Sequence, residues 1–413
     1  MIPVAAVRHV PHNPPELIKV RSGSRPIWCM ENVCLTLENS PDWQGILAFD
    51  EFSVLNLVLR PIPGTSARRS TFTPRELLET DVTAAIRWFN RNGFPDATKN
   101  VMQDAMQAVA RQNIISPVKH YLEELQWDGT LRIDEWLQTY CEALGDGLVR
   151  RFGRKFLIAA VARALRPGCK ADNALVLEGA QGAGKSSALK ALAGEAWFFD
   201  GLRDMHGKDA SASLKGKWIV ELPELSAMRR SDVESVKAFL SRTEERYRPP
   251  YGRGEVLEPR RCVFAGTTNR SDYLADDTGG RRFWPVPIGR IDVTGLTRDR
   301  DQIWAEAVAA FKNGEPWWLS PEDEAGAAEI VADRQLEDPW SGNVLALADG
   351  LPEVSSGQLF ELMEITLERR SRAEAMRIGG ILTRAGWKKE GKFKGGPYKD
   401  TTRYVPPKRE GLA

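Results

Sequence analysis

The sequence predicts an α/β fold of the P-loop NTPase type: a parallel sheet with flanking helices, preceded by a helical block and followed by a winged helix. Two observations predict the core. Between residues 174 and 288, short apolar runs alternate with helical stretches, as strands and crossover helices do in a parallel sheet. One of these runs leads directly into Gly179–Ser186, which reads GAQGAGKS and has the complete G-x-x-x-x-G-K-S spacing of a phosphate loop.

Composition and charge exclude several other classes of protein. Of the 413 residues, 42% are hydrophobic and 27% are charged, a balance typical of a globular protein rather than a disordered or fibrous one. The 57 basic and 56 acidic residues give a net charge of +1, so any attraction to a polyanion must come from local patches. No apolar run approaches the roughly 18 residues of a membrane span and no signal pattern is visible, so we expect no membrane association.

The cysteines indicate a reducing compartment. They are widely spaced and include no Cys-x-x-Cys pair, which argues against a disulfide framework or a structural zinc site. We therefore expect a cytoplasmic protein. The cysteines are Cys29, Cys34, Cys141, Cys169 and Cys262.

Changes in pattern along the chain divide it into five expected segments. Prolines and two short apolar runs, at 45–49 and 54–59, predict an N-terminal arm with a small strand-bearing element. Apolar residues spaced three or four apart then predict helices as far as Gly168. The segments are 1–72 (arm and strand-bearing element), 73–168 (helical domain), 169–300 (phosphate-loop core), 301–348 (helical extension) and 349–413 (winged-helix-like basic domain).

The chemistry of the phosphate loop points to a nucleoside triphosphate. Glycines allow backbone N–H groups to turn inward around phosphate oxygens, and the helix that begins here adds partial positive charge. We expect Lys185 to reach the β- and γ-phosphates of ATP, and the Ser186 hydroxyl to ligate Mg²⁺. A glycine-rich turn without a ligand is the alternative. The expected nucleotide-binding residues are Gly179, Ala180, Gln181, Gly182, Ala183, Gly184, Lys185, Ser186 and Ser187.

Two carboxylates follow a second apolar run and complete the expected metal site. The run 218–220 is followed by Glu221 and, three residues later, by Glu224. Nucleotide hydrolysis needs an acidic group at the end of a neighbouring strand, to hold magnesium and to activate the attacking water. Either glutamate suits either role, and capping of the next helix is an alternative for Glu224. The expected metal-binding residues are Ser186 and Glu221.

Polar residues at two further positions suit the γ-phosphate. Asn269 follows an apolar run, and in ring ATPases with an inserted central strand an amide at this position senses the γ-phosphate; a simple turn residue is the alternative. Arg281 and Arg282 suit an arginine finger that reaches the nucleotide of a neighbouring subunit. An ion pair with Asp276 or Asp277 is the other explanation, and one arginine could serve each role. The expected catalytic residues are Lys185, Glu221, Glu224, Asn269, Arg281 and Arg282.

Together these motifs resemble the virulence-associated E family, whose ATPase core is similar to the superfamily 3 helicases of phage and plasmid primase-helicases. The resemblance implies an AAA+-type hexameric ring in a phage or another mobile element, tied to the initiation of replication. It also implies the loop, acidic-strand, sensor and finger roles for the residues named above. The matching stretches run in order from about residue 30 to 290 and include HYLEELQWDGTLRIDEW (120–136), GKWIVELPEL (216–225), RRCVFAGTTN (260–269) and TGGRRFWPV (278–286).

A cluster of arginines and tyrosines between residues 242 and 261 is the first expected contact with DNA. Superfamily 3 helicases have a hairpin at this chain position, and it grips nucleic acid in the central channel. Arginine binds phosphate and tyrosine stacks on bases, whereas a solvated hairpin with internal ion pairs is the alternative. The expected DNA-binding residues here are Arg246, Arg248, Tyr251 and Arg253.

The basic tail is the second expected contact with DNA. From residue 369 to 409 it has thirteen Lys and Arg against three acidic residues. Helices at 355–363 and 373–385, followed by a hairpin that returns at 401–405, are typical of a winged helix with 373–385 as recognition helix. A protein-docking winged helix is the alternative. The expected DNA-binding residues are Lys388, Lys389, Lys392 and Lys394.

The sequence therefore predicts an ATP-dependent DNA helicase or translocase that acts as an oligomeric ring in DNA replication. Its expected cofactors are ATP and Mg²⁺, and its expected partner is single-stranded or forked DNA. No primase signature precedes the core, so a primase on another chain is a candidate partner. Two alternatives remain open: an ATPase that loads or remodels replication proteins without unwinding, and an NTP-dependent regulatory or defence switch. A small-molecule kinase fits poorly, because no lid-like arginine pattern is present.

Overall fold

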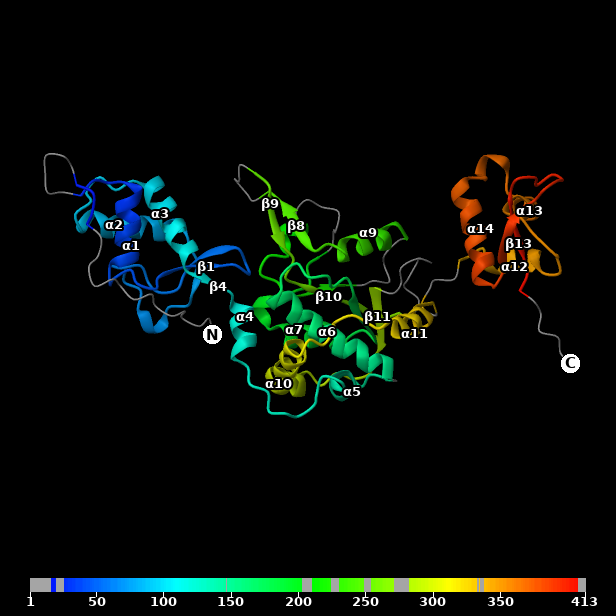
Figure 1. Ribbon diagram of the computed structural model, residues 1–413, viewed down its shortest axis with the longest axis horizontal. Helices are drawn as coiled ribbons and strands as arrows, with labels where there is room; N and C mark the ends of the chain where they lie inside the picture. Colours follow the sequence, from blue (N-terminus) through cyan, green and yellow to red (C-terminus); the bar gives the residue numbers. More distant parts are fainter. Residues whose placement is uncertain are drawn as a thin grey trace. The chain divides into compact units, whose positions relative to one another are not determined.

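The computed structural model describes most of the chain and contains two compact units (Figure 1). The larger unit holds the described residues up to 270 together with 282–331, and the smaller unit holds those from 332 onwards. Among the described residues, no helix combines the length and the apolar character that a membrane span requires. The described residues are 16–19, 26–145, 147–202, 210–223, 230–248, 254–270, 282–332, 334 and 338–407.

A four-stranded sheet with three helices forms the N-terminal part of the larger unit. The strand order is β3-β2-β1-β4, and helix α3 packs on β1 and β2. The strands expected at 45–49 and 54–59 are confirmed as β1 and β2. The elements are α1 (Met30–Asn39), β1 (Leu47–Asp50), β2 (Leu55–Val58), β3 (Arg75–Glu76), α2 (Glu79–Arg91), α3 (Lys99–Gln112) and β4 (Ile114–Ile115), with a 3₁₀ turn at Arg69–Thr71.

The segment boundary expected at residue 72 falls inside this packed element. Strand β2 pairs with β3 across it, and one core joins Val33 and Trp43 on its upstream side to Phe89 and Met102 on its downstream side. Hydrophobic periodicity describes each helix separately and does not show which distant segments share a core. The sequence pattern also misses helix α1, which lies in the expected arm and strand-bearing segment. It misses strands β3 and β4, which lie in the segment expected to be helical.

Three helices lead from this element to the central sheet. Pro117 lies in the first turn of the first helix, where its missing N–H costs no helical hydrogen bond. The loop that follows is tied to helix α10 (Val293–Lys312), because the backbone N–H groups of Arg132 and Ile133 both donate to the buried carboxylate of Glu306. The helices are α4 (Pro117–Glu124), α5 (Trp136–Cys141) and α6 (Gly147–Leu165).

The central sheet has five parallel strands in the order β11-β5-β10-β7-β6. The four apolar runs of the sequence are confirmed as strands, and the short strand β6 is an addition. Strand β10 lies between the strand of the phosphate loop and the strand of Glu221, which is the inserted central strand that the sequence predicts. The strands are β5 (Ala174–Glu178), β6 (Phe198–Phe199), β7 (Ile219–Leu222), β10 (Val263–Thr268) and β11 (Phe283–Pro287).

Helices cover both faces of this sheet. On one face, α6, α10 and α7 (Lys185–Ala193) pack on the strands and on one another (Figure 1). On the other face, Phe239 of α9 (Arg230–Leu240) meets Phe264 of β10, with ring centroids 5.6 Å apart. The remaining helices of the unit are α8 (Ala210–Ser213) and α11 (Pro321–Ala332), with a 3₁₀ turn at Glu195–Trp197.

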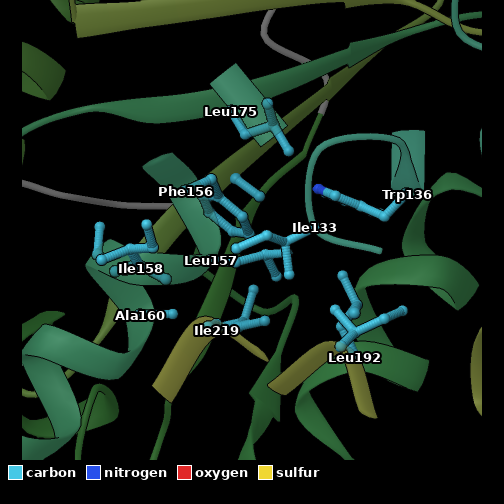
Figure 2. Close-up of a cluster of buried hydrophobic side chains, with 14 of the residues drawn as sticks. Ile133, Trp136, Phe156, Leu157, Ile158, Ala160, Leu175, Leu192 and Ile219 are labelled. Carbon is cyan, nitrogen blue, oxygen red and sulfur yellow. The ribbon is translucent and has the colours of Figure 1, made fainter. Parts of the chain in front are cut away.

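The main core lies between the sheet and helices α6, α7 and α10. Figure 2 shows Phe156 and Leu157 of α6 converging with Leu175 of β5, Leu192 of α7 and Ile219 of β7. All five side chains are at most 2% exposed, and burying each contributes about 1.5–3 kcal/mol. This packing fixes the carboxyl ends of β5, β7 and β10 relative to one another, which is what the candidate site requires.

A separate two-stranded hairpin precedes β10. Its strands are β8 (Glu244–Tyr247) and β9 (Val256–Pro259), and they pair antiparallel with Arg246 opposite Leu257. The hairpin expected between Glu221 and Asn269 is therefore present. Its tip, residues 249–253, lies outside the described residues.

The smaller unit consists of three helices and a hairpin around its own core. The two helices and the hairpin that the sequence predicts are all present, and an isolated bridge pairs Val354 with Tyr404 of the hairpin. Ile378 and Leu382 contribute to the core together with Tyr404. The elements are α12 (Ser341–Ala348), α13 (Ser356–Leu362), α14 (Arg372–Arg384), β12 (Lys388–Lys392) and β13 (Thr402–Val405), with a 3₁₀ turn at Leu367–Arg369.

Candidate functional site

The loop between β5 and α7 has the backbone of a phosphate cradle. Gly182 and Gly184 have φ angles of +80° and +91°, a region that other residues rarely adopt. Gly179 is also required, since a Cβ there would lie 2.9 Å from the Ile288 side chain. The first helical hydrogen bond of α7 is donated by Ala188 to the Gly184 carbonyl, so the N–H groups of the preceding turn have no helical acceptor. These N–H groups suit an anion.

Lys185 lies in this loop with its ammonium group close to the cradle. Its Nζ donates to the carbonyl oxygens of Gly179 and Ala180, at 2.7 and 2.8 Å. Burial lowers the pKa of the Lys185 ammonium, and the nearby Glu221 carboxylate opposes that shift. A bound polyanion would favour the charged form further, because opposite charges stabilise each other at short range.

Strand register explains why Glu221 points at the phosphate loop. Glu221 lies opposite Ala265 of β10, on the face of the sheet that packs against α7. Its Oε1 accepts a hydrogen bond from Ser186 Oγ at 2.8 Å, and a second from Thr267 Oγ1 at 2.6 Å. Two adjacent strands, β7 and β10, and the N-terminus of α7 thus bring one carboxylate and two hydroxyls together.

The second oxygen of Glu221 is the unusual atom of the site. Glu221 is only 2% exposed, and its Oε2 has no hydrogen-bond partner among the described residues. A buried carboxylate oxygen without a donor is costly, because its desolvation is not compensated. Glu221 therefore needs a further cationic or hydrogen-bonding group at this position.

A pocket of about 620 Å³ lies over the loop and contains most of the expected site residues. Asn269 lies at its wall, directly after β10, with Thr267 and Thr268 beside it. Glu224, the other expected carboxylate, lies outside the described residues. The pocket is lined by Gln181, Gly182, Ala183, Gly184, Lys185, Ser186, Ser187, Glu221, Pro223, Thr267, Thr268 and Asn269.

Arg282 lies at the opposite end of the sheet from this pocket. It directly precedes β11, which is parallel to β5, whereas the phosphate loop follows the carboxyl end of β5. Its Nε donates to Ser241 Oγ at 3.1 Å and lies 3.6 Å from Oδ2 of Asp172. Arg282 is therefore too far from the pocket of its own chain to contact a nucleotide there. Arg281 lies outside the described residues.

Comparison with known proteins identifies the family. The model of the virulence-associated protein E-like domain matches residues 122–336, more than half of the chain. The chain belongs to this family. The matched region contains the whole pocket and the β8–β9 hairpin. No curated protein matches the chain.

The VapE-like chain is also similar in fold to solved structures. One is the apo C-terminal region of NrS-1, with 14% identity and a TM-score of 0.47, covering 87% of this chain and 95% of that one. Another is a RuvB mutant of Thermotoga maritima, with 12% identity and a TM-score of 0.24, covering 62% of this chain and 92% of that one. At these TM-scores the likenesses establish neither a shared activity nor a shared assembly.

The arginine and tyrosine cluster of the VapE-like domain divides into exposed and buried residues. Arg246 and Arg248 are exposed on β8 and just beyond it. Tyr247 is buried and donates to Glu258, so it is unavailable for stacking on a base. Arg260 is 2% exposed and forms an ion pair with Glu245, so it is not one of the exposed basic residues of the cluster. Tyr251 and Arg253 lie outside the described residues.

Arg260 shows why a basic residue in this segment can be structural. Its guanidinium lies 4.7 and 5.0 Å from the ring centroids of Phe239 and Phe264, beside this edge-to-face pair, and donates to the Phe239 carbonyl. The side chain thereby fixes the base of the β8–β9 hairpin to the central sheet. Sequence spacing alone does not separate such a residue from an exposed one.

Sequence reasoning missed Thr267 as a site residue. Its hydroxyl is one of the two donors to Glu221, and it is 6% exposed. The signal that could have found it is alternation along β10, which places Thr267 on the same face as Ala265 and hence beside Glu221.

Proposed function

We propose that this VapE-like chain is an ATP-dependent DNA helicase or translocase that acts as an oligomeric ring, expected to be a hexamer, in the replication of a phage or mobile element. The main support for NTP hydrolysis is the hydrogen-bonded group of Ser186, Glu221 and Thr267 beside the phosphate loop. A phosphate cradle alone would support binding, whereas a buried carboxylate joined to the Ser186 hydroxyl supports metal-assisted cleavage.

The donor set of the pocket fits Mg²⁺. Ser186 Oγ donates a hydrogen bond to Glu221, so the lone pairs of its oxygen stay available, and Glu221 Oε2 lacks a partner among the described residues. Hydroxyl and carboxylate oxygens are ligands that Mg²⁺ prefers, with phosphates and waters supplying the rest. The ion that these residues would hold would supply positive charge against the negative charge that develops during transfer. We assign Ser186 and Glu221 to the metal, and Glu224 to orienting the attacking water.

The remaining pocket residues hold the triphosphate. Lys185 would turn from the carbonyl oxygens of the loop to the β- and γ-phosphates, and the glycine-rich backbone would surround their oxygens. Asn269, at the end of the inserted strand, would contact the γ-phosphate or the water that attacks it. These groups supply positioning and electrostatic stabilisation, which are the main components of phosphoryl-transfer catalysis.

We propose different roles for the two arginines before β11: a structural role for Arg282 and a catalytic role for Arg281. Arg282 has the contacts of a structural ion pair with Asp172, while Asp276 and Asp277 lie outside the described residues. We therefore assign the arginine finger to Arg281. Since β11 begins at the end of the sheet opposite the phosphate loop, a finger here would complete the site of an adjoining copy in a ring.

Two surfaces are proposed to contact DNA. The β8–β9 hairpin would present Arg246 and Arg248, with Tyr251 and Arg253 towards its tip, to a strand in the ring channel. The smaller unit, with its helices α13 and α14 and the β12–β13 hairpin, has the element order of a winged helix and would bind DNA through its basic residues.

Replacing Thr267 by valine is expected to lower NTP turnover about 10- to 150-fold, because a hydrogen bond to a charged group contributes about 1.5–3 kcal/mol. The change removes one donor to Glu221 but keeps the shape of the side chain. Nucleotide affinity measured in EDTA with a fluorescent analogue should not change. Thr267→Ser keeps the hydroxyl and should retain most of the turnover. Full turnover in the valine variant would show that Thr267 does not position Glu221.

The proposed function is tested with forked DNA and two readouts. We expect ATP hydrolysis that depends on Mg²⁺ and rises when DNA is added, together with displacement of the labelled strand. Stimulated hydrolysis without displacement would favour the loader or remodeller. Hydrolysis that does not respond to DNA would contradict both and favour a regulatory switch.

A further inference from the structure

Helix α14 of the smaller unit presents few groups that could recognise bases. One side of the helix is buried through Ile378, Ile381 and Leu382. The centre of its outward side is Met376, which is 69% exposed, and the neutral Gly380 lies one turn further along. The other exposed residues of the helix are Arg372, Ala373, Thr383 and Arg384.

The basic residue in the middle of α14 is already engaged within the unit. Arg377 donates to both carboxylate oxygens of Asp338, each at 2.6 Å, and its guanidinium lies 4.2 Å from the centroid of the Trp340 ring. This bidentate pair raises the pKa of Arg377 and lowers the pKa of Asp338. Arg377 thereby joins α14 to the segment before α12, and binding a base would require that this pair be broken.

Reading a base sequence in the major groove requires several side chains with paired donors or acceptors, such as Arg, Asn or Gln. A recognition helix places its N-terminal half in the major groove. In that half of α14, Arg372 is the one exposed residue with paired donors or acceptors. One bidentate contact discriminates roughly 5- to 150-fold at a single base pair. The surface of α14 therefore does not suit the recognition of a defined sequence.

The β12–β13 hairpin, in contrast to α14, has many exposed basic side chains. Every residue of β12 is exposed, and the only carboxylate in this strand, Glu390, is paired with Arg403 at 3.1 Å. None of the hairpin lysines forms an ion pair with a described residue. These exposed lysines are Lys388, Lys389, Lys392, Lys394 and Lys399.

A bulge in β12 arranges part of this charge on one face. Lys389 lies opposite Tyr404 and Lys392 opposite Thr402, although they are three residues apart on their own strand. The extra residue is accommodated near Gly391, which has a φ of +73°. Because Tyr404 and Thr402 share a face of β13, Lys389 and Lys392 also share one, and both lysines are exposed. Lys389 Nζ lies 5.9 Å from the centroid of the Tyr404 ring, at the edge of the core of the unit.

From these observations we infer that the β12–β13 hairpin, and not helix α14, is the nucleic-acid contact of the smaller unit, and that it binds the phosphate backbone without selecting a base sequence. The inference rests on the proposed function, since it specifies how the unit would bind DNA. It replaces the recognition-helix interpretation of 373–385. Such a contact suits a protein that must move along DNA of any sequence, because lysine–phosphate pairs are equivalent at every step.

The test compares two sets of variants in the full chain, with DNA affinity measured by fluorescence anisotropy across a salt series. A triple change of Lys389, Lys392 and Lys394 to glutamine should weaken binding at least tenfold at low salt. It should also reduce the slope of log K against log [salt] by about 2 to 3, one counterion for each lost contact. This decrease in slope is expected even if the β8–β9 hairpin also binds DNA.

The matched control changes the exposed side of α14. Arg372→Gln with Met376→Ser should alter affinity less than about twofold, and selection from a randomised duplex pool should enrich no sequence. Thermal unfolding of each variant checks that the smaller unit is folded. Enrichment of a defined sequence, loss of binding in the α14 variant, or an unchanged salt slope in the lysine variant would overturn the inference while leaving the proposed function in place. Failure of the unsubstituted chain to bind any DNA would refute both.

Discussion

Replacing Lys185 by alanine is expected to reduce NTP turnover at least about 10²- to 10³-fold, the loss measured when one donor to a transition-state charge is removed. The physical reason is that Lys185 is the cation of the phosphate loop, and no other described lysine or arginine lines the pocket. The fold should be retained, because the side chain makes only two hydrogen bonds, both to carbonyl oxygens of the loop. Turnover and thermal unfolding of the purified variant are the measurements.

Lys190 provides the matched control on the same helix. It is exposed on α7, where its ammonium lies 2.7 Å from the Glu195 carboxylate, and it does not line the pocket. Lys190→Ala also removes a lysine ammonium group, but at a position more than one helical turn beyond the phosphate loop. Turnover should stay within about twofold of that of the unsubstituted chain. Equal turnover in the Lys185 and Lys190 variants would refute the nucleotide site.

Replacing Arg281 by alanine is expected to lower turnover about 10³- to 10⁵-fold, the range found for arginine fingers. Nucleotide binding in the absence of turnover should be nearly unchanged, because the finger belongs to the site of a neighbouring copy. The parallel change Arg282→Ala should instead act on stability. It removes contacts to Ser241 and Asp172 from a side chain that is 21% exposed, and should lower the free energy of unfolding by about 1–2 kcal/mol.

Mixing two inactive variants tests whether the finger acts between copies. A Lys185→Ala chain retains Arg281, and an Arg281→Ala chain retains Lys185, so an interface between them can contain one complete site. Turnover should therefore reappear in the mixture and reach a maximum near equal proportions. A mixture as inactive as its components would show that the arginine does not act between copies.

The sequence predicted the central sheet and the phosphate loop well, for a physical reason. Each strand of a buried parallel sheet is a continuous apolar run, and each polar group of the site follows the end of such a run. Lys185, Glu221 and Asn269 can therefore each be predicted from the residues next to them in the chain. The position of β10 between β5 and β7 agrees with the comparison of Asn269 to ring ATPases that have an inserted central strand.

What the sequence could not supply is the set of contacts between distant segments. The hydrogen bonds from Ser186 and Thr267 to Glu221 depend on strand register, and they place the Glu221 carboxylate at the phosphate loop. Arg260 and Tyr247 occur in a segment of polar character, yet long-range packing buries both. A pattern of charge cannot distinguish an arginine buried against two aromatic rings from one in solvent.

The smaller unit shows the same division between local and long-range information. Its helices and hairpin follow from local pattern, and their bounds agree with the expected ranges within a few residues. The pairing of Arg377 with Asp338 joins positions 39 residues apart, and it engages the basic residue in the middle of the expected recognition helix. Our inference that the hairpin, and not the helix, would contact DNA therefore rests on contacts that the sequence does not show.

The central claim is that a nucleoside triphosphate bound over the β5–α7 loop is cleaved with the help of an adjoining copy of the chain. Its most direct test measures mass and specific turnover together, by sedimentation and ATP hydrolysis across a range of protein concentrations with Mg²⁺ and single-stranded DNA present. We predict that turnover per chain rises as the chains assemble, and is low where single copies predominate. A chain that remains a single copy and hydrolyses ATP at the same rate at every concentration would contradict the account.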